Sequence, residues 1–203
     1  MAEYDTIRSV GVGARAQIDE GLRAHMNKVY GLMSVAMVVT AGVAWAVGSS
    51  DQLFSILRNP VTGSMTILGW VAMFLPLGMV FAFGALINRM SVAAAQLFFY
   101  AFAAAMGLSL AWIFQVFTGV SVASTFLITA IAFAGLSLYG YTTKRDLSAM
   151  GTFLMMGLIG LIVAMVVNIF LASSALAFAI SVIGVLIFAG LTAYDTQNIK
   201  NTY

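Results

Sequence analysis

One carboxylate, Asp195, directly follows a long apolar segment. Residues 175–194 carry no charged side chain. A carboxylate near the centre of a bilayer costs about 2.5–3.5 kcal/mol, so it is retained there only where another group compensates its charge. No glycine or proline stops the helix after Asp195, and its neighbours four and seven residues away on that helix are Phe188, Leu191 and Ile199. We expect Asp195 to lie on a buried apolar face and to need a cation, a second carboxylate or a bound ion; the alternative is an interfacial Asp that reaches water.

Arg89 is a candidate partner for this carboxylate. It lies between two expected apolar segments, residues 61–87 and 92–117. Arg89 could simply set the topology by extending its side chain to lipid headgroups, or it could pair with Asp195 if the two helix ends meet. A buried pair of this kind adds little net stability, but breaking it leaves a lone charge, which suits a latch that opens when Asp195 is protonated. Lys200, five residues after Asp195, lies well round the helix and is a poor partner.

The most polar internal segment contains Lys144, Arg145 and Asp146. A charged stretch between two apolar segments is usually a solvated loop at the membrane surface. Basic side chains in that position can also contact anionic lipids or a protein partner. Both interpretations remain open for this loop.

The composition assigns the chain to the membrane. Of its 203 residues, 62% are hydrophobic and 8% are charged, and the mean hydropathy is +1.03. A soluble domain does not carry so much apolar surface. The absence of Cys excludes disulfides and thiolate metal sites, and a single His, His25, argues against a zinc enzyme. The net charge of +2 gives no sign of nucleic-acid binding, and catalytic motifs are missing, so we expect neither an enzyme nor a bound cofactor.

The apolar segments predict an all-α, polytopic transmembrane helix bundle over residues 25–203. Residues 1–24 are polar and are expected to form a cytosolic N-terminal arm that becomes helical near Ile18. Each apolar segment is close to or above the roughly 20 residues that a helix needs to cross a bilayer. The six predicted spans are residues 26–48, 61–87, 92–117, 122–141, 151–171 and 175–194.

The basic residues predict the orientation of these spans. With the N-terminus in the cytosol, Arg58 is the one Lys or Arg on the opposite side. Because cytosolic loops carry an excess of Lys and Arg, this orientation is the favoured one, and it places Arg89, Asp146 and Asp195 on the cytosolic side. The cytosolic basic residues are then Arg8, Arg15, Arg23, Lys28, Arg89, Lys144, Arg145 and Lys200.

Three segments resemble the Bax inhibitor-1 (transmembrane Bax inhibitor motif) family, in particular its bacterial branch. They are residues 25–32, at the start of the first span, 135–148, which contains Thr-Thr-Lys-Arg-Asp, and 191–199, which contains Tyr-Asp-Thr-Gln. The last two motifs are fairly specific when they occur together. The resemblance extends from about Arg23 to Tyr203.

The resemblance implies a helical bundle in the bacterial inner membrane that lets calcium leak down its gradient in a pH-dependent way. In this family two aspartates near the cytosolic end of the pore share a proton, and an arginine after the second span pairs with one of them in the closed state. Asp195 matches the first aspartate by its motif, and Arg89 matches the arginine by its place. The implied site is therefore a calcium and proton site at Asp195, gated by Arg89.

Two further expectations follow from the resemblance. The family's second aspartate lies on a seventh helix after the Tyr-Asp-Thr-Gln motif. This sequence ends at Tyr203, and Asp146 lies in a loop and does not match that residue, so the sequence leaves open whether the chain is truncated or works with one carboxylate. Some bacterial relatives associate with an ATP-dependent membrane protease, which makes a membrane scaffold, docked through residues 1–24, the alternative function.

Overall fold

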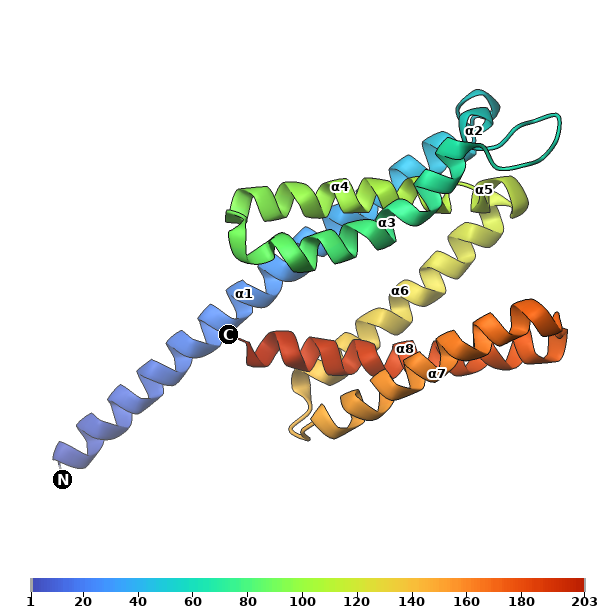
Figure 1. Cartoon of the computed structure of the whole chain (residues 1–203). Coiled ribbons are helices and arrows are strands. Elements are labelled where there is room, and N and C mark those ends of the chain that lie inside the picture. Colours follow the sequence, from blue (N-terminus) through green and yellow to red (C-terminus); the bar gives the residue numbers. More distant parts are fainter. Residues whose placement is uncertain (1, 203) are drawn as a thin grey trace. The chain divides into compact units, whose positions relative to one another are not determined.

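Figure 1 shows the computed structural model, which describes the backbone of residues 2–202 and the side chains of residues 20–202. Within this range the chain is helical, apart from turns and one isolated β-bridge between Arg58 and Met65. The elements in chain order are α1 (Ala2–Gly48), α2 (Asp51–Leu57), α3 (Ile67–Leu86), the short 3-10 helix η1 (Ile87–Arg89), α4 (Val92–Leu110), α5 (Ile113–Val116), α6 (Gly119–Thr142), α7 (Ser148–Leu171) and α8 (Ser174–Asn201).

Six helical segments of the described chain are long and apolar enough to cross a membrane, which confirms the predicted spans and the all-α class. α1 begins at Ala2, before the helix start expected near Ile18. α8 continues to Asn201, as the absence of a helix-breaking residue after Asp195 predicts. The cytosolic position of the N-terminus, the separate arm of residues 1–24 and the placement of the charged loops on one side stay predictions from the charges. The spans are α1 from Glu20, α3 with η1, α4 with α5, α6, α7 and α8.

Large apolar side chains cover the outside of the helices. Phe81, Phe153, Phe170 and Phe178 are each more than 70% exposed. Water would not tolerate so many exposed aromatic and aliphatic groups, whereas lipid tails are as apolar as these side chains. The buried residues are mostly small, which allows close approach between helices in the absence of a hydrophobic driving force.

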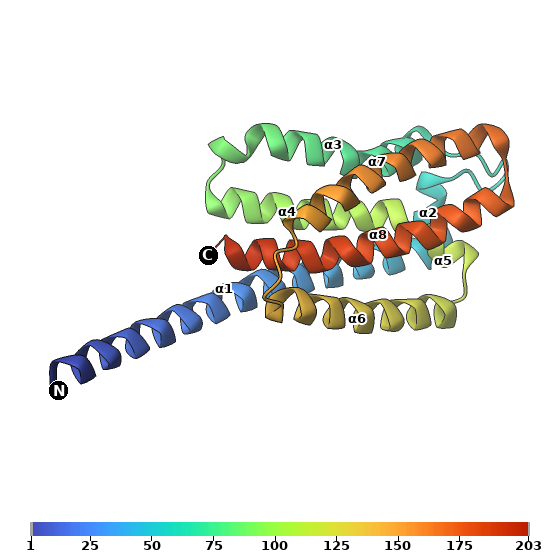
Figure 2. The same cartoon turned by 90° about the horizontal axis from the view of Figure 1, so that it is seen from below.

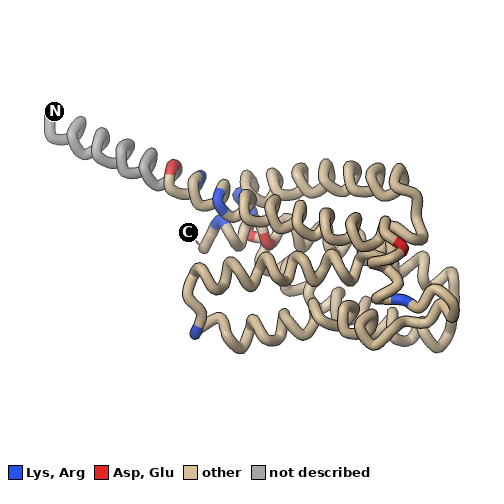
Figure 3. The backbone as a smooth tube through the Cα atoms, turned by 90° about the horizontal axis from the view of Figure 1, so that it is seen from above, with Lys and Arg blue, Asp and Glu red and all other residues tan. Residues whose placement is uncertain are grey.

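Charged side chains lie where the exposed apolar side chains end, at or near the ends of the spans and in the loops. Figure 3 shows the described Lys, Arg, Asp and Glu residues at or near the ends of the spans and in the loops, while the middles of the helices carry none. A charge in the middle of a span would lose its hydration, so this distribution is typical of helices that cross a bilayer.

The chain divides into two compact units, which are described separately. The first, residues 27–125, is called the α3–α4 unit. In it, α3 and α4 form a hairpin whose helices lie side by side in Figures 1 and 2. Ser91 caps the start of α4 by accepting a hydrogen bond from the amide of Ala94 at 3.2 Å. The rings of Phe83 and Phe98 stack across the hairpin with centroids 5.4 Å apart.

The same unit joins α1 to the α4–α5 region through polar contacts to backbone carbonyls. The Thr40 hydroxyl donates to the carbonyl of Ala103 at 2.8 Å, and the Gln115 amide donates to the carbonyl of Gly48 at 2.6 Å. Gly107 has no room for a Cβ, which would lie 2.6 Å from the Thr40 carbonyl oxygen. These helices therefore approach backbone to backbone.

The second unit, residues 1–26 and 126–203, is called the α7–α8 unit. α7 and α8 pack as a hairpin around Leu161, Ile187 and Leu191. Its turn contains Ala172, which has a left-handed backbone conformation (φ 47°), and Ser173, whose hydroxyl accepts from the first turn of α8. The turn is therefore closed by a backbone conformation common at helix C-termini and by a side-chain cap.

Candidate functional site

Asp195 lies near the C-terminal end of α8, on an exposed part of the helix surface. Its neighbours Thr196 and Gln197 are only 3% and 8% exposed. The expectation that Asp195 lies on the buried face of the helix is therefore wrong within the α7–α8 unit. Leu191 is buried as expected, but Phe188 is 55% exposed. In a membrane, apolar residues cover the lipid-facing side as well as the protein-facing side, so apolar neighbours do not identify the buried face of a helix.

Gln197 joins α8 to the loop between α6 and α7. Its Oε1 accepts a hydrogen bond from the backbone amide of Leu147 at 2.9 Å, and its Nε2 donates to the carbonyl of Arg145 at 2.8 Å. Leu147 is itself only 6% exposed. The Gln197 clasp, meaning these two hydrogen bonds, satisfies one donor and one acceptor of the loop backbone at a buried position.

Lys200 makes a second contact between α8 and the end of α6. Its Nζ donates to the carbonyl of Tyr141 at 2.7 Å and lies 5.3 Å from the centre of the Tyr141 ring. The carbonyl is at the C-terminal end of α6, where a cation is favourable, and the ring adds a cation–π contact. Lys200 therefore interacts with α6, in agreement with the prediction that it is a poor partner for Asp195.

Glycines let the helices beside Asp195 come close. A Cβ on Gly140 of α6 would collide with the carbonyl of Ala193, and a Cβ on Gly151 of α7 would lie 2.6 Å from the ring of Tyr194. Ala193 and Tyr194 immediately precede Asp195 in the sequence. The backbone of α8 at the site is thus fixed from two sides by glycine contacts.

Asp146 serves mainly as a local cap. Lys144, Arg145 and Asp146 are all exposed, and an Asp146 carboxylate oxygen accepts from the Ser148 amide at 2.9 Å, at the start of α7. Hydrogen bonds from the side chain and the backbone of Ser148 hold the pKa of Asp146 below its ordinary value. The structure therefore gives Asp146 a role in starting α7, and leaves Lys144 and Arg145 accessible.

Arg89 ends η1 in the α3–α4 unit, where its side chain is exposed. Asp195 belongs to the α7–α8 unit, so the pairing of the two stays a prediction. Among the described residues no group of three or more His, Cys, Asp or Glu side chains gathers into a metal site.

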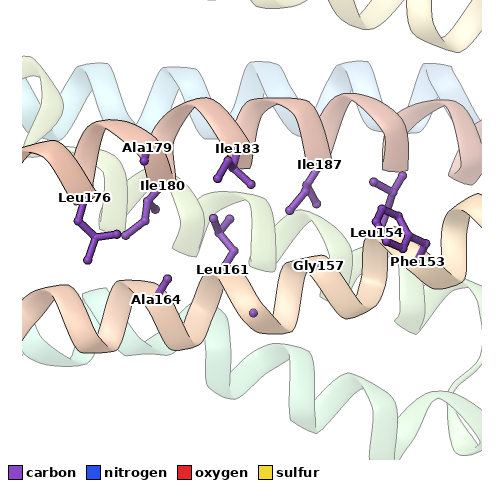
Figure 4. Close-up of a pocket in the computed structure, with 11 residues that line it drawn as sticks. Phe153, Leu154, Gly157, Leu161, Ala164, Leu176, Ala179, Ile180, Ile183 and Ile187 are labelled. Atoms are coloured by element: carbon purple, nitrogen blue, oxygen red, sulfur yellow. The ribbon is translucent and has the colours of Figure 1, made fainter.

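A groove in the α7–α8 unit is apolar throughout. Figure 4 shows it between α7 and α8, with Leu161 pointing from α7 towards α8. It measures about 360 Å³ and is lined only by Phe, Leu, Ile, Ala and Gly residues. Without a polar group to orient a ligand, it is a packing surface rather than a chemical site.

Sequence reasoning missed two polar residues beside the site. Gln197 lies two residues after Asp195 and points to the other side of α8, as its burial shows. The sequence signal that could have identified it is a side-chain amide in the part of α8 where the apolar residues end and polar residues begin. Ser137 lies one turn before Gly140 on α6, and its buried hydroxyl has no hydrogen-bond partner in the described part of the chain. A serine within an apolar span gives no sequence signal of this kind.

Comparison with known proteins identifies the family. Residues 22–203 match the family described as inhibitor of apoptosis-promoting Bax1. Inner membrane protein YbhL of Escherichia coli K12 is 44% identical over 181 residues, which is 89% of this chain and 75% of YbhL. An uncharacterised protein of Rickettsia prowazekii, RP147, is 44% identical over 185 residues, 91% of this chain and 76% of that protein.

A third relative, an uncharacterised protein of Caulobacter vibrioides, is 45% identical over 194 residues, 94% of this chain and 77% of that protein. No solved structure matches the chain. The family match covers most of the chain, and the six apolar helices agree with the inner-membrane description of YbhL. The chain therefore belongs to the Bax inhibitor-1 family of integral inner-membrane proteins.

Proposed function

We propose that the chain is a passive calcium leak channel of the inner membrane whose conduction depends on pH. Asp195 is its calcium and proton site, and Arg89 is the cation that closes it. The observation that carries the proposal is the position of Asp195: an exposed carboxylate at the end of an apolar span, on a helix fixed by the Gln197 clasp. An ionised carboxylate at the end of an apolar span is stabilised when a cation or a proton neutralises it.

The chemistry of a single carboxylate favours passage of calcium over tight binding. Calcium prefers six to eight oxygen ligands, so Asp195 with water and carbonyl groups binds it weakly enough to release it. In the closed state ionised Asp195 pairs with Arg89. Protonation removes the negative charge, the pair loosens, and the flux rises as the pH falls through the titration of Asp195.

The alternative proposal is a membrane scaffold that restrains another membrane protein, such as an ATP-dependent membrane protease. The exposed Lys144 and Arg145 and the continuous helix α1, which starts at Ala2, support it as possible docking elements. In this alternative Asp195 has only a structural role. Deletion of residues 1–24 separates the two, because a scaffold loses its effect on the partner while a channel continues to conduct.

The test is calcium flux into proteoliposomes at several pH values, with Asp195→Asn and Arg89→Ala beside the unmodified chain. The channel predicts a flux that rises at acidic pH, loses its pH dependence in Asp195→Asn and stays high at neutral pH in Arg89→Ala. Asp51→Asn is the matched control, because Asp51 is an exposed acid at a helix start in the α3–α4 unit. Absence of flux in every variant after verified reconstitution would overturn the channel.

A further inference from the structure

A groove in the α3–α4 unit combines an apolar interior with one cation at its edge. It measures about 430 Å³, within the range of about 300–1,000 Å³ typical of ligand pockets. The cation is Arg58, which directly follows α2. Among the lining side chains are Phe54, Leu57, Met65, Met73, Leu108 and Trp112.

The guanidinium of Arg58 is held at this edge by the loop between α2 and α3. Its Nε donates to the carbonyl of Gly63 at 2.6 Å, and the Arg58 backbone forms the β-bridge to Met65. The hydrogen bond to Gly63 uses Nε, which leaves the terminal N–H groups of the fork for another acceptor. Arg58 is exposed, and the acid nearest to it along the chain, Asp51, lies about 10 Å away at the other end of α2 by helix rise.

The tryptophans place this edge at a membrane–water interface. All three Trp residues of the chain lie near the same end of the α3–α4 unit: Trp45 in the last turn of α1, Trp70 in the first turn of α3 and Trp112 between α4 and α5. They are 62%, 50% and 47% exposed. Tryptophan is enriched at the headgroup level of membranes because its ring is apolar and its N–H is polar.

The groove extends from this level into the apolar layer. Along α3 its lining residues run from Gly69, in the first turn, to Met73, which lies about 9 Å of helix rise from the helix start at Ile67. Its lining is apolar except for Arg58 and Ser109, and the Ser109 hydroxyl already donates to the carbonyl of Met106 at 3.0 Å. The groove therefore has an apolar interior and a single cationic side chain, Arg58, at its edge.

We propose that this groove binds one acyl chain of an anionic glycerophospholipid whose phosphate is held by Arg58. A guanidinium fork matches the geometry of a phosphate and forms charge-assisted hydrogen bonds with it. The apolar interior accepts the acyl chain without burying an unpaired polar group. This site is independent of the calcium proposal, because Arg89, the cation assigned to gating, lies beyond the opposite end of α3.

Fluorescence quenching by brominated lipids tests the proposal, because Trp112 lines the groove. The reporter is a variant with Trp45→Phe and Trp70→Phe, which keeps Trp112 alone, in bilayers of brominated phosphatidylglycerol or brominated phosphatidylcholine. We expect the anionic lipid to associate about fivefold more strongly at Trp112, the preference that one surface cation confers on an anionic lipid. A second reporter that keeps only Trp70, which does not line the groove, is expected to show little preference.

Three substitutions in the Trp112 reporter locate the interaction. Arg58→Gln is expected to abolish the preference, and Arg58→Lys to retain part of it, since Lys holds phosphate as a point charge. Ser109→Phe is expected to fill the groove and reduce quenching by both lipids. Arg89→Gln is the matched control, because it removes the same kind of charge at the other end of the same unit, and it is expected to leave the preference intact.

Several results would overturn the proposal. Equal quenching of Trp112 by the two lipids with Arg58 present would exclude a site that selects the anionic lipid, whatever the variants do. If the preference for the anionic lipid survives Arg58→Gln, or is as large at Trp70, then it reflects a general attraction of the anionic lipid to the basic chain and not a site at Arg58. Absence of quenching at Trp112 while Trp70 is quenched would mean that protein, and not lipid, covers the groove.

Discussion

The loop between α2 and α3 is held by its own residues, whereas the loop between α6 and α7 is held by a side chain that lies about 50 residues further along the chain. In the first, Asn59 Oδ1 accepts hydrogen bonds from the backbone amides of Val61 and Thr62, and the backbone amide of Asn59 donates to the carbonyl of Ser64. In the second, Gln197 supplies both contacts to the loop backbone.

The comparison shows which of the two loops would move when a neighbouring helix moves. A self-contained loop keeps its shape when a neighbouring helix shifts, because its hydrogen bonds move with it. The loop held by Gln197 must follow α8, or lose two hydrogen bonds at a buried position. Lys144 and Arg145 at the surface and Asp195 on α8 are therefore mechanically linked, while Arg58 on its loop is not linked in this way to a distant helix.

The largest expected effect is that of Gln197→Ala. It removes both hydrogen bonds and leaves the buried amide of Leu147 unpaired, which should destabilise the chain by about 2–4 kcal/mol. Thermal unfolding in detergent measures the loss, and hydrogen exchange should show the Leu147 amide losing protection. The exposed neighbour provides the control, since Asn198→Ala should change either readout little. An unchanged exchange rate at Leu147 would show that the loop does not depend on α8.

Gly140→Ala should have the next largest effect. Its new Cβ would collide with the Ala193 carbonyl and force α6 away from α8, at a cost of about 1–3 kcal/mol. Gly135→Ala on the same helix is the control, because a Cβ there meets no atom within 4 Å and improves helix propensity. Comparison of the two melting temperatures checks the prediction. Equal shifts for both variants would contradict the close contact between α6 and α8.

Asn59→Ala should have a smaller and local effect. It removes the acceptor for the amides of Val61 and Thr62 in an exposed loop, at a cost of about 1 kcal/mol. Faster hydrogen exchange or proteolysis within residues 58–66 measures it, and Asn59→Asp, which keeps the acceptor, should rescue it. A loss of protection that spreads to α3 or α4 would show that this loop is not self-contained.

The smallest expected effect is the pH dependence that Asp146 gives to the stability of the start of α7. The pKa of Asp146 is lower in the folded chain than in the unfolded chain. The stability that its ionised carboxylate contributes is therefore fully present above the unfolded-state pKa, and it is lost as the pH falls through the folded-state pKa. The start of α7 should therefore lose protection at acidic pH, and Asp146→Asn should remove that pH dependence. Exchange of the Ser148 amide between neutral and acidic pH provides the measurement. Identical profiles for the two chains would contradict a capping role.

The sequence was sufficient for the spans and the family, because long apolar segments and short motifs are local signals. It failed on the burial of Asp195, because the lipid-facing and protein-facing sides of a membrane helix are equally apolar, as Phe188 and Leu191 illustrate. It also missed Gln197, whose role depends on residues far away in the chain. The pairing of Arg89 with Asp195 stays a prediction for the same reason: sequence spacing does not determine contacts between distant segments.

The turn at Ala172 has a consequence for how the chain enters the membrane. With only Ala172 and Ser173 between the two helices, the ends of α7 and α8 are joined too closely for either helix to settle far from the other. Contacts between neighbouring segments form fastest because little chain entropy is lost in closing a short loop. We expect α7 and α8 to leave the insertion machinery as a preformed pair and not as two separate helices.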